Sequence, residues 1–470
     1  MPNKAALQDA DLASLRARFP ASFTWGAATS AAQIEGAHDE AGKGPSIWDR
    51  FASVPGHIED GSTPARGCDH FHRWPEDLDA LAWLGVTAYR FSIAWPRILP
   101  EGTGSVVEAG LDFYDRLVDG LLARGIDPFV TLYHWDLPQA LEDRGGWRNR
   151  ATVDAFAELT QVVARRIGDR VRSFATHNEP WCAAMLGHHA GVHAPGLKDL
   201  SAALAAGHHI LLSHGRAVEV LRAEAPGAQV GIVQMVSPGH PASPSAADAE
   251  ATRVFDGELN RWFVEPPALG RYPDDMLERH LRAGAIDDRH PVMARPDDLE
   301  VIATPTDYLG INYYSRTIVR APIPEHENAP VTVARDEVDL SDMDWEVYPD
   351  GLKESLRRAR RDWGIEHIYV TENGAAYDEG PGPDGQVRDA RRVRYLTRHL
   401  HTLAEAVDEG LPVEGYFVWS LLDNFEWAFG YRKRFGLFWV DFDTCERRPK
   451  ASAFTYRAFL AGPTGGGVES

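Results

Sequence analysis

Eight short apolar runs, separated by amphipathic stretches, constrain the fold of this chain more than any other feature of its sequence. The runs cover residues 23–29, 88–95, 128–135, 171–178, 229–236, 308–314, 367–371 and 415–421. Short and almost continuously apolar runs such as 129–133 are typical of strands buried on both faces of a parallel sheet. The stretches between them, such as 153–167, repeat apolar residues every three or four positions, as helices do. Eight such β–α units predict an α/β protein with a single closed (β/α)8 TIM barrel.

The length of 470 residues fits one barrel with elaborated βα loops, because such barrels absorb insertions there. An open doubly wound sheet is the competing interpretation, but its glycine-rich βα turn is missing. The G-x-G-x-x-G pattern at 380–385 is interrupted by Pro381 and Pro383 and predicts a surface loop. We expect an N-terminal extension over 1–18, the barrel over 19–461 and a flexible Gly-rich tail over 462–470. The longest insertion, 315–366, holds a proline- and charge-rich stretch at 321–330 and predicts a lid or rim.

Composition excludes several classes of protein. With 69 acidic and 48 basic residues, the net charge of −21 argues against a nucleic-acid partner and for a soluble surface. No apolar run is long enough for a membrane span, and residues 1–20 lack the apolar core of a signal peptide, so we expect a cytoplasmic location. Neither the three cysteines nor the histidine groups at 188–193 and 208–214 have metal-site spacing, so we expect no metal and no cofactor. The sequence leaves open whether the chain forms a homo-oligomer.

Two glutamates follow directly on predicted strands. Glu179 stands in a T-H-N-E-P motif at 176–180, and Glu372 in a T-E-N-G motif at 371–374. Because the active site of a (β/α)8 barrel lies at the carboxyl ends of its strands, we expect both side chains to face one pocket. Paired carboxylates can protonate a glycosidic oxygen on one side and attack the sugar carbon on the other. For either motif alone, a structural glutamate bound to backbone or arginine is an equally good interpretation.

The other strand ends carry polar and aromatic side chains. They are Gln33, Arg90, His134, Trp135, Asn178, Asn312, Tyr314, Trp419, Glu426 and Trp427. A sugar presents hydroxyls around its edge and C–H groups on its faces, so amides, imidazoles and carboxylates suit the edge and indoles suit the faces. This set therefore predicts a carbohydrate pocket.

These motifs resemble those of family 1 glycoside hydrolases, the β-glucosidase family, from residue 23 to about residue 459. The matching segments are FTWGAATSAAQIEG at 23–36, YRFSI at 89–93, YHWDLP at 133–138, the two glutamate motifs, and WSLLDNFEW at 419–427. They stand in the order that the family has. The resemblance implies a retaining β-glucosidase that acts on small-molecule β-glycosides and takes part in polysaccharide and cellulose degradation.

The resemblance also implies a role for each site residue. Glu179 would be the general acid/base, Glu372 the nucleophile, and Asn178 the partner of the sugar 2-hydroxyl. Gln33, His134, Trp135, Glu426 and Trp427 would bind the remaining sugar groups, with Trp419 under the ring and Phe435 at the far end of the pocket. Trp345 would be the platform for the aglycone, and Arg90, Asn312 and Tyr314 would surround Glu372.

Physical chemistry supports this division of roles. An arginine and a tyrosine hydroxyl near Glu372 favour its ionised form, whose charge in turn keeps Glu179 protonated. The two carboxyl groups are expected roughly 5 Å apart, too close for an intervening water. We expect Cys182 to be an inert helix residue, and His188, where the family commonly has tyrosine, to alter the entrance.

Two alternatives within the family involve other substrates or none. Members acting on 6-phosphorylated sugars resemble this chain but have serine at the position of Glu426 and tyrosine at that of Phe435. Their phosphate-binding lysine is present here as Lys433, yet an ionised Glu426 predicts repulsion of a phosphate. Non-catalytic sugar-binding relatives lose one or both glutamates, which this chain retains. The same residues serve several sugar epimers, so glucose, galactose and fucose are not distinguished.

Overall fold

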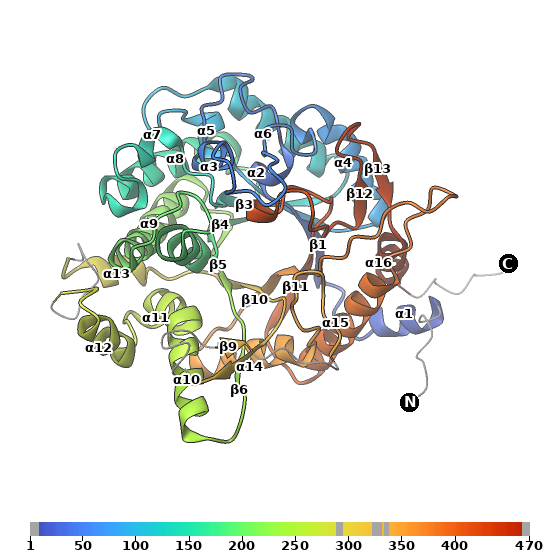
Figure 1. The fold of residues 1–470 in the computed structure, drawn as a ribbon. Helices are drawn as coiled ribbons and strands as arrows, with labels where there is room; N and C mark the ends of the chain where they lie inside the picture. The colour runs from blue at the N-terminus through green and yellow to red at the C-terminus, as the bar shows by residue number, and fades with distance from the viewer. Residues whose placement is uncertain (1–8, 288–294, 322–330, 333–337, 463–470) are drawn as a thin grey trace.

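The computed structural model describes residues 9–287, 295–321, 331–332 and 338–462 (Figure 1). Eight parallel strands close into a barrel in the order β1-β11-β10-β7-β5-β4-β3-β2. They are β1 (Thr24–Ala28), β2 (Ala88–Ser92), β3 (Asp127–Tyr133), β4 (Ser173–Asn178), β5 (Gln229–Met235), β7 (Tyr308–Asn312), β10 (Ile368–Asn373) and β11 (Val413–Trp419). Each predicted apolar run overlaps one of these strands, although β3, β10 and β11 extend one or two residues beyond their runs. The predicted barrel is therefore confirmed and the open sheet is excluded.

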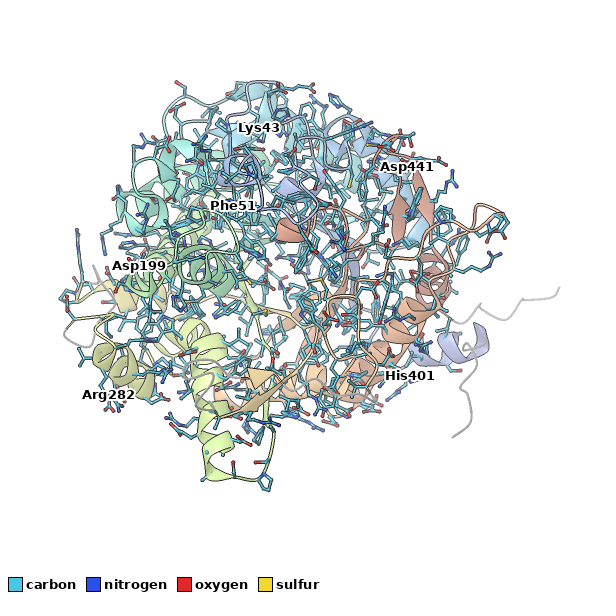
Figure 2. All side chains as sticks on the ribbon, in the orientation of Figure 1. Lys43, Phe51, Asp199, Arg282, His401 and Asp441 are labelled. Atoms are coloured by element: carbon cyan, nitrogen blue, oxygen red, sulfur yellow. The ribbon has the colours of Figure 1, made fainter. Side chains whose placement is uncertain are left out.

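Helices surround the barrel and cover the outward faces of its strands (Figure 1). The main ones are α4 (His70–Leu84), α6 (Glu108–Leu122), α8 (Ala151–Ile167), α9 (Leu200–Glu224), α11 (Trp262–Leu269), α13 (Asp298–Ile302), α14 (Asp350–Asp362), α15 (Ala390–Asp408) and α16 (Ala451–Ala461). The helix predicted at 153–167 corresponds to α8. Side chains fill the space between the helices and the strands (Figure 2).

Further elements lie in the connections. They are α1 (Asp9–Arg16), α2 (Ala31–Ile34), α3 (Ile47–Ala52), α5 (Trp95–Ile98), α7 (Gln139–Glu142), η1 (Gly146–Arg148), η2 (Cys182–Ala190), β6 (Gly239–Pro241), α10 (Ala246–Asp256), η3 (Gly257–Arg261), α12 (Asp274–Arg282), β8 (Thr317–Arg320), β9 (Val331–Thr332), η4 (Trp427–Phe429), β12 (Phe438–Val440) and β13 (Arg447–Pro449). β8 pairs with β6 and β9 outside the barrel.

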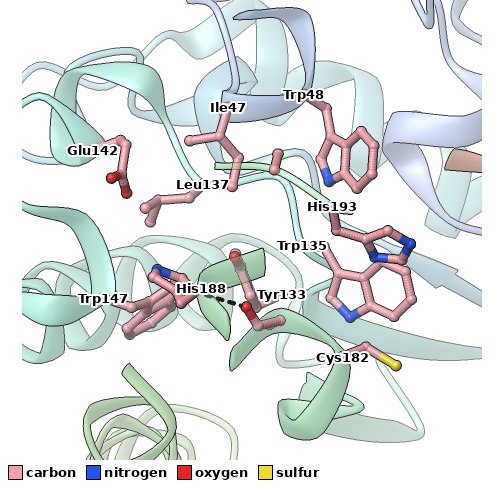
Figure 3. A pocket seen from close by; sticks show the side chains of 12 residues that line it. Ile47, Trp48, Tyr133, Trp135, Leu137, Glu142, Trp147, Cys182, His188 and His193 are labelled. Carbon is pink, nitrogen blue, oxygen red and sulfur yellow. Dashed lines mark hydrogen bonds between the residues drawn. The ribbon is translucent and has the colours of Figure 1, made fainter. Parts of the chain in front are cut away.

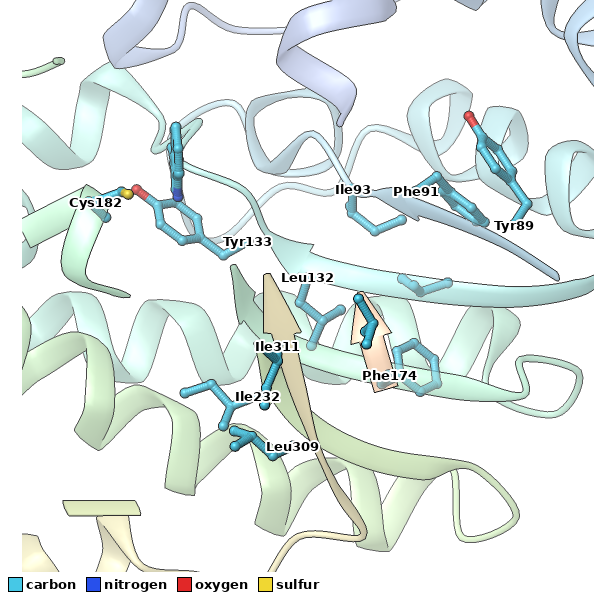
Figure 4. Packing of buried hydrophobic residues seen from close by; sticks show 14 of the residues in the cluster. Tyr89, Phe91, Ile93, Leu132, Tyr133, Phe174, Cys182, Ile232, Leu309 and Ile311 are labelled. Atoms are coloured by element: carbon cyan, nitrogen blue, oxygen red, sulfur yellow. The ribbon is translucent and has the colours of Figure 1, made fainter. Parts of the chain in front are cut away.

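The core has two parts because the strands are buried on both faces. Between strands and helices lies the main apolar cluster, which includes Ile93, Leu132, Phe174, Ile232 and Ile311 (Figure 4). A smaller cluster combines strand residues with two loop residues, Ala376 and Phe435; its other members are Ala28, Ala88, Phe129, Tyr308, Tyr369, Phe417 and Trp419. The second cluster includes two predicted site residues, Trp419 and Phe435, so it supports the site from below.

The prediction of one long insertion over residues 315–366 is partly wrong. Residues 350–362 form α14, a barrel helix that leads to β10, because apolar positions such as Leu352 and Leu356 give it a buried face. Residues 315–318, 340 and 343–346 do line the cavity described below, so the prediction of a rim is confirmed there. Most of the proline- and charge-rich stretch, 322–330, lies outside the described residues.

Both ends of the described chain meet on one side of the barrel. α1 lies beside α16 (Figure 1), with Leu12 and Leu15 buried in the main cluster. The domain boundaries at residues 18 and 461 stay predictions, and the tail from 463 onward lies outside the described residues. Within the described part of the chain, no helix combines the length and apolarity that crossing a membrane requires.

Candidate active site

A cavity of about 690 Å³ opens at the carboxyl ends of the barrel strands. The predicted residues that line it are His134, Trp135, Asn178, Glu179, Tyr314, Trp345, Glu372, Trp419, Glu426, Trp427 and Phe435. Gln33, Arg90 and Asn312 are buried behind this lining and bind its side chains. The barrel therefore brings all the predicted residues to one place.

Glu372, in β10, has a strong donor on each carboxylate oxygen. The Arg90 guanidinium donates to Oε1 from Nη1 at 2.6 Å, and the Tyr314 hydroxyl donates to Oε2 at 2.5 Å. The side chains of Glu372 and Arg90 are almost fully buried. A cation and a phenol at this distance stabilise the ionised carboxylate, which leaves Glu372 prepared to act as a nucleophile.

Glu179, directly after β4, has weaker partners. Asn312 Nδ2 donates to Oε1 at 2.8 Å, and the thiol of Cys182 donates to Oε2, with Sγ at 3.1 Å. The backbone of Glu179 has a φ of 45°, a left-handed conformation that a non-glycine residue adopts only where its surroundings hold it. The prediction that Asn312 belongs with Glu372 is thus incomplete, since its amide binds Glu179.

Asn178 connects the environments of the two glutamates. Its Oδ1 accepts from Arg90 Nη2 at 2.7 Å and from Asn312 Nδ2 at 3.0 Å. Its Nδ2 lies 3.1 Å from His134 Nε2. Burial lowers the pKa of His134 well below its usual value, so the ring is neutral and Nε2 accepts this bond. The proton then lies on Nδ1, which is buried and has no partner among the described residues.

The two glutamates differ electrostatically as well as geometrically. Burial, followed by the charge of Glu372, raises the pKa of Glu179 to about 7. Burial also raises the pKa of Glu372, but Arg90 and the Tyr314 hydroxyl oppose that shift. Of the pair, Glu372 therefore loses its proton first, while Glu179 retains its own near neutral pH.

The surroundings of Glu426 favour its protonated form. Burial, with the charges of Glu372 and Glu179, raises the pKa of Glu426 to about 8. Its only nearby donor among the described residues is Gln33 Nε2, at a long 3.4 Å. We expected an ionised carboxylate at this position, whereas the raised pKa favours the protonated form, because neither a cation nor a short hydrogen bond offsets the desolvation.

Aromatic rings enclose the carboxyl groups. His134 stacks near Trp419 and Trp427, with ring centroids 5.8 and 6.0 Å apart and planes within 19° of parallel. On the opposite side, Tyr314 packs against Trp345, with centroids 5.4 Å apart. Trp345 is 36% exposed, which places it at the mouth of the cavity. A ring-shaped ligand can thus lie between apolar faces while its edge meets the amides and carboxyls.

A sequence model described as "Glycosyl hydrolase family 1" matches residues 15–462. The chain belongs to this family. It is similar to beta-glucosidase A of Acetivibrio thermocellus, with 46% identity over 94% of this chain and 98% of that protein. It is also similar to beta-glucosidase A of Thermotoga maritima, with 44% identity over 93% of this chain and 97% of that protein.

Solved structures of family 1 enzymes have the same fold. The family 1 β-glucosidase from Thermotoga maritima superposes with a TM-score of 0.89 at 44% identity, covering 93% of this chain and 97% of the other. The virulence factor SghA from Agrobacterium tumefaciens gives a TM-score of 0.92 at 44% identity, and the match covers 96% of this chain and 99% of SghA. Membership in family 1 and the (β/α)8 fold are therefore established together.

Lys433, which some family 1 enzymes use to bind phosphate, is engaged elsewhere in this chain. Its Nζ donates to the backbone carbonyl of Asp342, and the ammonium lies 5.5 Å from the centroid of the Phe429 ring. The residues that line the cavity include Phe429 but not Lys433. In this arrangement the lysine supports the rim and does not line the cavity.

His188 is not at the entrance, so that expectation is wrong. The ring is buried in η2, and its Nδ1 lies 3.0 Å from the carbonyl oxygen of Ala183. It lines a separate water-sized cavity with Tyr133 and Trp147 (Figure 3). The π-helical turns of η2 direct this side chain into the core, an orientation that a tyrosine-to-histidine difference alone does not reveal.

Two histidines of α9 serve the core. On α9, His208 binds the hydroxyl of Tyr272 and the carboxylate of Asp298, while His214 binds the hydroxyl of Thr176. The prediction of structural roles is confirmed for these two residues. The described residues contain no group of three or more His, Cys, Asp or Glu arranged to hold a metal ion.

Sequence reasoning missed Cys182 as a site residue. The expectation that it is inert is wrong, because its thiol binds Glu179. The spacing of three residues gave a usable signal, since positions i and i+3 share one face of a helical turn. Sequence reasoning also missed the apolar lining provided by Met235, Phe255 and Met343, which lie far apart along the chain.

Proposed function

We propose that this protein is a retaining β-glucosidase that releases terminal, non-reducing β-D-glucosyl residues. The observation that carries the proposal is the unequal environment of two buried glutamates. Glu372 is held by a guanidinium and a phenol, whereas Glu179 is held by an amide and a thiol. Only the first environment strongly favours the carboxylate, so we assign Glu372 as the nucleophile and Glu179 as the acid/base.

In the first step, Glu372 attacks the anomeric carbon and forms a glycosyl ester. Glu179 gives its proton to the glycosidic oxygen, and the bond between this oxygen and the anomeric carbon breaks. Esterification removes the negative charge of Glu372, which had raised the pKa of Glu179. Glu179 then acts as the base that deprotonates a water, whose oxygen attacks the anomeric carbon and releases Glu372. Two displacements leave the product in the β configuration.

The surrounding residues hold the sugar. We assign Asn178 to the 2-hydroxyl, because it binds Arg90 and Asn312, which in turn bind the two glutamates. We assign His134, which lines the cavity beside Asn178, to a neighbouring hydroxyl. A neutral Glu426 can both donate to and accept from sugar hydroxyls. We propose that Gln33 holds Glu426 in position, because its amide binds both the Glu426 carboxyl group and the backbone carbonyl of the preceding residue, Phe425.

The finer substrate assignments are proposals as well. A relative from Thermotoga neapolitana, 43% identical over 93% of this chain and 97% of its own, is described as a 1,4-beta-D-glucan glucohydrolase. That similarity supports a role in degrading β-linked glucose oligosaccharides, including those from cellulose. The three cysteines are buried and free, as suits the reducing conditions of the cytoplasm, where we place the protein.

The test is to trap the glycosyl ester. An activated 2-deoxy-2-fluoro-β-glucoside should inactivate the enzyme and add one fluoroglucosyl group to the peptide containing Glu372. The Glu372→Gln variant should not be labelled, and NMR of the wild-type reaction should show β-glucose as the first product. Labelling at another residue or initial α-glucose would refute the mechanism.

A further inference from the structure

The T-E-N-G motif contains a second buried polar residue, Asn373, to which the proposed mechanism gives no role. Asn373 follows Glu372 at the end of β10, is fully buried, and does not line the active-site cavity. Its Nδ2 donates to the backbone carbonyl of Tyr313 at 2.7 Å and to the hydroxyl of Tyr395 at 2.9 Å. Its Oδ1 accepts from the hydroxyl of Tyr416 at 2.7 Å. The amide is thus engaged on the side of the strand end that faces away from the sugar.

Tyr395 connects this amide to a second residue beside the nucleophile. It lies on α15, between α14 and α16 in the layer of helices (Figure 1). Its hydroxyl accepts the bond from Asn373 and donates to the backbone carbonyl of Tyr314 at 3.2 Å. Tyr314 is the residue whose own hydroxyl donates to Oε2 of Glu372 at 2.5 Å. One helix side chain therefore links the strand end that carries the nucleophile to the residue that stabilises the charge of the nucleophile.

The ring of Tyr395 is held in place by its surroundings. It is buried and stacks on His399, four residues further along α15, with ring centroids 3.9 Å apart and planes 26° apart. Burial lowers the pKa of His399 to about 3, so that ring is neutral. Burial raises the pKa of Tyr395 well above its usual value, so the hydroxyl keeps its proton. A protonated hydroxyl on a fixed ring can accept from Asn373 and donate to Tyr314 at the same time.

The backbone around Tyr314 depends on this connection. Tyr313 and Tyr314 follow the end of β7. The amide of Tyr313 donates to the carbonyl of Glu372 at 3.0 Å, and its carbonyl accepts from Asn373. The next carbonyl, that of Tyr314, accepts from Tyr395. Because a short, charge-assisted hydrogen bond depends steeply on its geometry, even a small movement of the Tyr314 phenol weakens its bond to Glu372.

We infer that Tyr395 is a positioning residue, whose hydroxyl holds the Tyr314 phenol against the nucleophile Glu372. The inference rests on the proposed function, since it concerns the nucleophile of that same reaction. Tyr395 does not line the cavity, so it acts through Tyr314 and not on the sugar.

The consequence of this positioning is a change in the acidity of Glu372. The ionisable groups that interact with Glu372 come from several strand ends and are Arg90, Glu179, Cys182, Tyr314 and Glu426. Of this set, Tyr314 is the member to which Tyr395 is hydrogen-bonded. The bond from Tyr314 lowers the pKa of Glu372, so weakening it should raise that pKa. Glu372 must be ionised to attack, so kcat/KM rises as pH rises through this pKa, and a raised pKa moves the acid limb to higher pH.

The first measurement is the pH profile of kcat/KM for 4-nitrophenyl β-glucoside with Tyr395→Phe. The acid limb should move upward by several tenths of a pH unit, up to about one, while the alkaline limb stays near the wild-type position. Tyr377→Phe is the matched control, because Tyr377 belongs to the same buried cluster and its hydroxyl has no hydrogen-bond partner among the described residues. An unmoved acid limb in Tyr395→Phe, or an equal shift in the control, would overturn the inference.

The second measurement tests whether Tyr395 acts through Tyr314. Tyr314→Phe removes the phenol itself and should move the acid limb further than Tyr395→Phe does. In the double variant the Tyr395 substitution should add nothing, because no phenol is left to position. Shifts that add would assign Tyr395 another route and overturn the inference.

A third variant tests the same chain of bonds if Tyr395→Phe does not fold. Tyr416→Phe releases the Asn373 amide at its other end and should give a smaller shift of the acid limb in the same direction. An acid limb at the wild-type position in this variant would overturn the inference.

The two proposals fail in different ways. If the activated fluoroglucoside does not label Glu372 in the wild type, the proposed function is wrong, whatever the pH profiles show. If Glu372 is labelled and the acid limb of Tyr395→Phe does not move, the function stands and the role of Tyr395 is refuted.

Discussion

The thiol of Cys182 donates a hydrogen bond to Glu179, with Sγ 3.1 Å from Oε2. The other carboxylate oxygen is occupied by the amide of Asn312. Because a thiol is a weak donor, this contact stabilises the ionised form of Glu179 only slightly and lets the carboxyl group keep a proton at neutral pH. The first helical turn after β4 thus contributes to the acidity of the residue to which we assign proton transfer.

We predict that Cys182→Ala raises the pKa of Glu179, because the thiol hydrogen bond lowers it in the wild type. The acid form of Glu179 is needed for the first step, so kcat/KM falls as pH rises through this pKa. Loss of the bond should move that alkaline limb upward by up to about one pH unit. Cys182→Ser retains a hydrogen-bond donor, so its alkaline limb should lie at or below the pH of the wild-type limb.

The control is Cys445→Ala, since Cys445 is buried away from the cavity. Its pH profile should match the wild type. A merely structural Cys182 would lower activity or stability without moving the alkaline limb, which would contradict the prediction.

The assigned roles of the two glutamates predict opposite responses to azide. Glu179→Ala should still form the glycosyl ester from an activated aryl glucoside that needs little protonation, and azide should restore turnover as a β-glucosyl azide. Glu372→Ala should lose hydrolysis, and azide in the vacated space should give the α-azide. NMR of the products distinguishes the two. Identical behaviour of the variants would show that the roles are misassigned.

The sequence was sufficient to predict the barrel and to predict which residues gather at the candidate site. Apolar periodicity reports burial on both strand faces, and a (β/α)8 barrel collects the strand ends at one edge, so Glu179 and Glu372 could be placed together. Individual partners could not be predicted in the same way. The bond from Asn312 to Glu179 depends on which side chains meet across β4 and β7, and the neutral state of Glu426 depends on the depth of its burial.

A buried ionic cluster supports the segment that carries Glu426. The carboxylate of Asp423 accepts from Lys450 Nζ at 2.6 Å and from Arg434 Nη1 at 2.9 Å. We predict that Asp423→Asn lowers the free energy of unfolding by about 3–5 kcal/mol, because the Lys450 ammonium is left buried and unpaired. Urea unfolding followed by tryptophan fluorescence measures the change.

The matched control is Asp408→Asn, which removes an exposed ion pair with Arg18. It should cost less than about 1 kcal/mol, since water screens exposed pairs. The double variant Asp423→Asn/Lys450→Met should recover part of the loss. Equal effects of the two single aspartate variants would show that the buried cluster is not what stabilises this segment.

The protonation of Glu426 predicts a pH-dependent rejection of phosphorylated sugars. The pKa of Glu426 is raised to about 8, so the group is neutral below that pH and ionised above it. Only the ionised form repels a phosphate dianion strongly, and Lys433 is bound to a backbone carbonyl outside the cavity lining. The ratio of kcat/KM for 4-nitrophenyl β-glucoside to that for its 6-phosphate should therefore exceed one at pH 7 and rise roughly tenfold or more by pH 9.

Taking the ratio at each pH cancels the titration of Glu179, which affects both substrates alike. The phosphate is mostly dianionic throughout, because its second pKa is about 6. Glu426→Gln should remove the rise above pH 7, since the amide does not titrate. A ratio that stays constant in the wild type would show that Glu426 keeps one charge state over this range. Equal or better activity on the 6-phosphate would show that Lys433 turns inward and that the substrate is a phosphorylated glycoside.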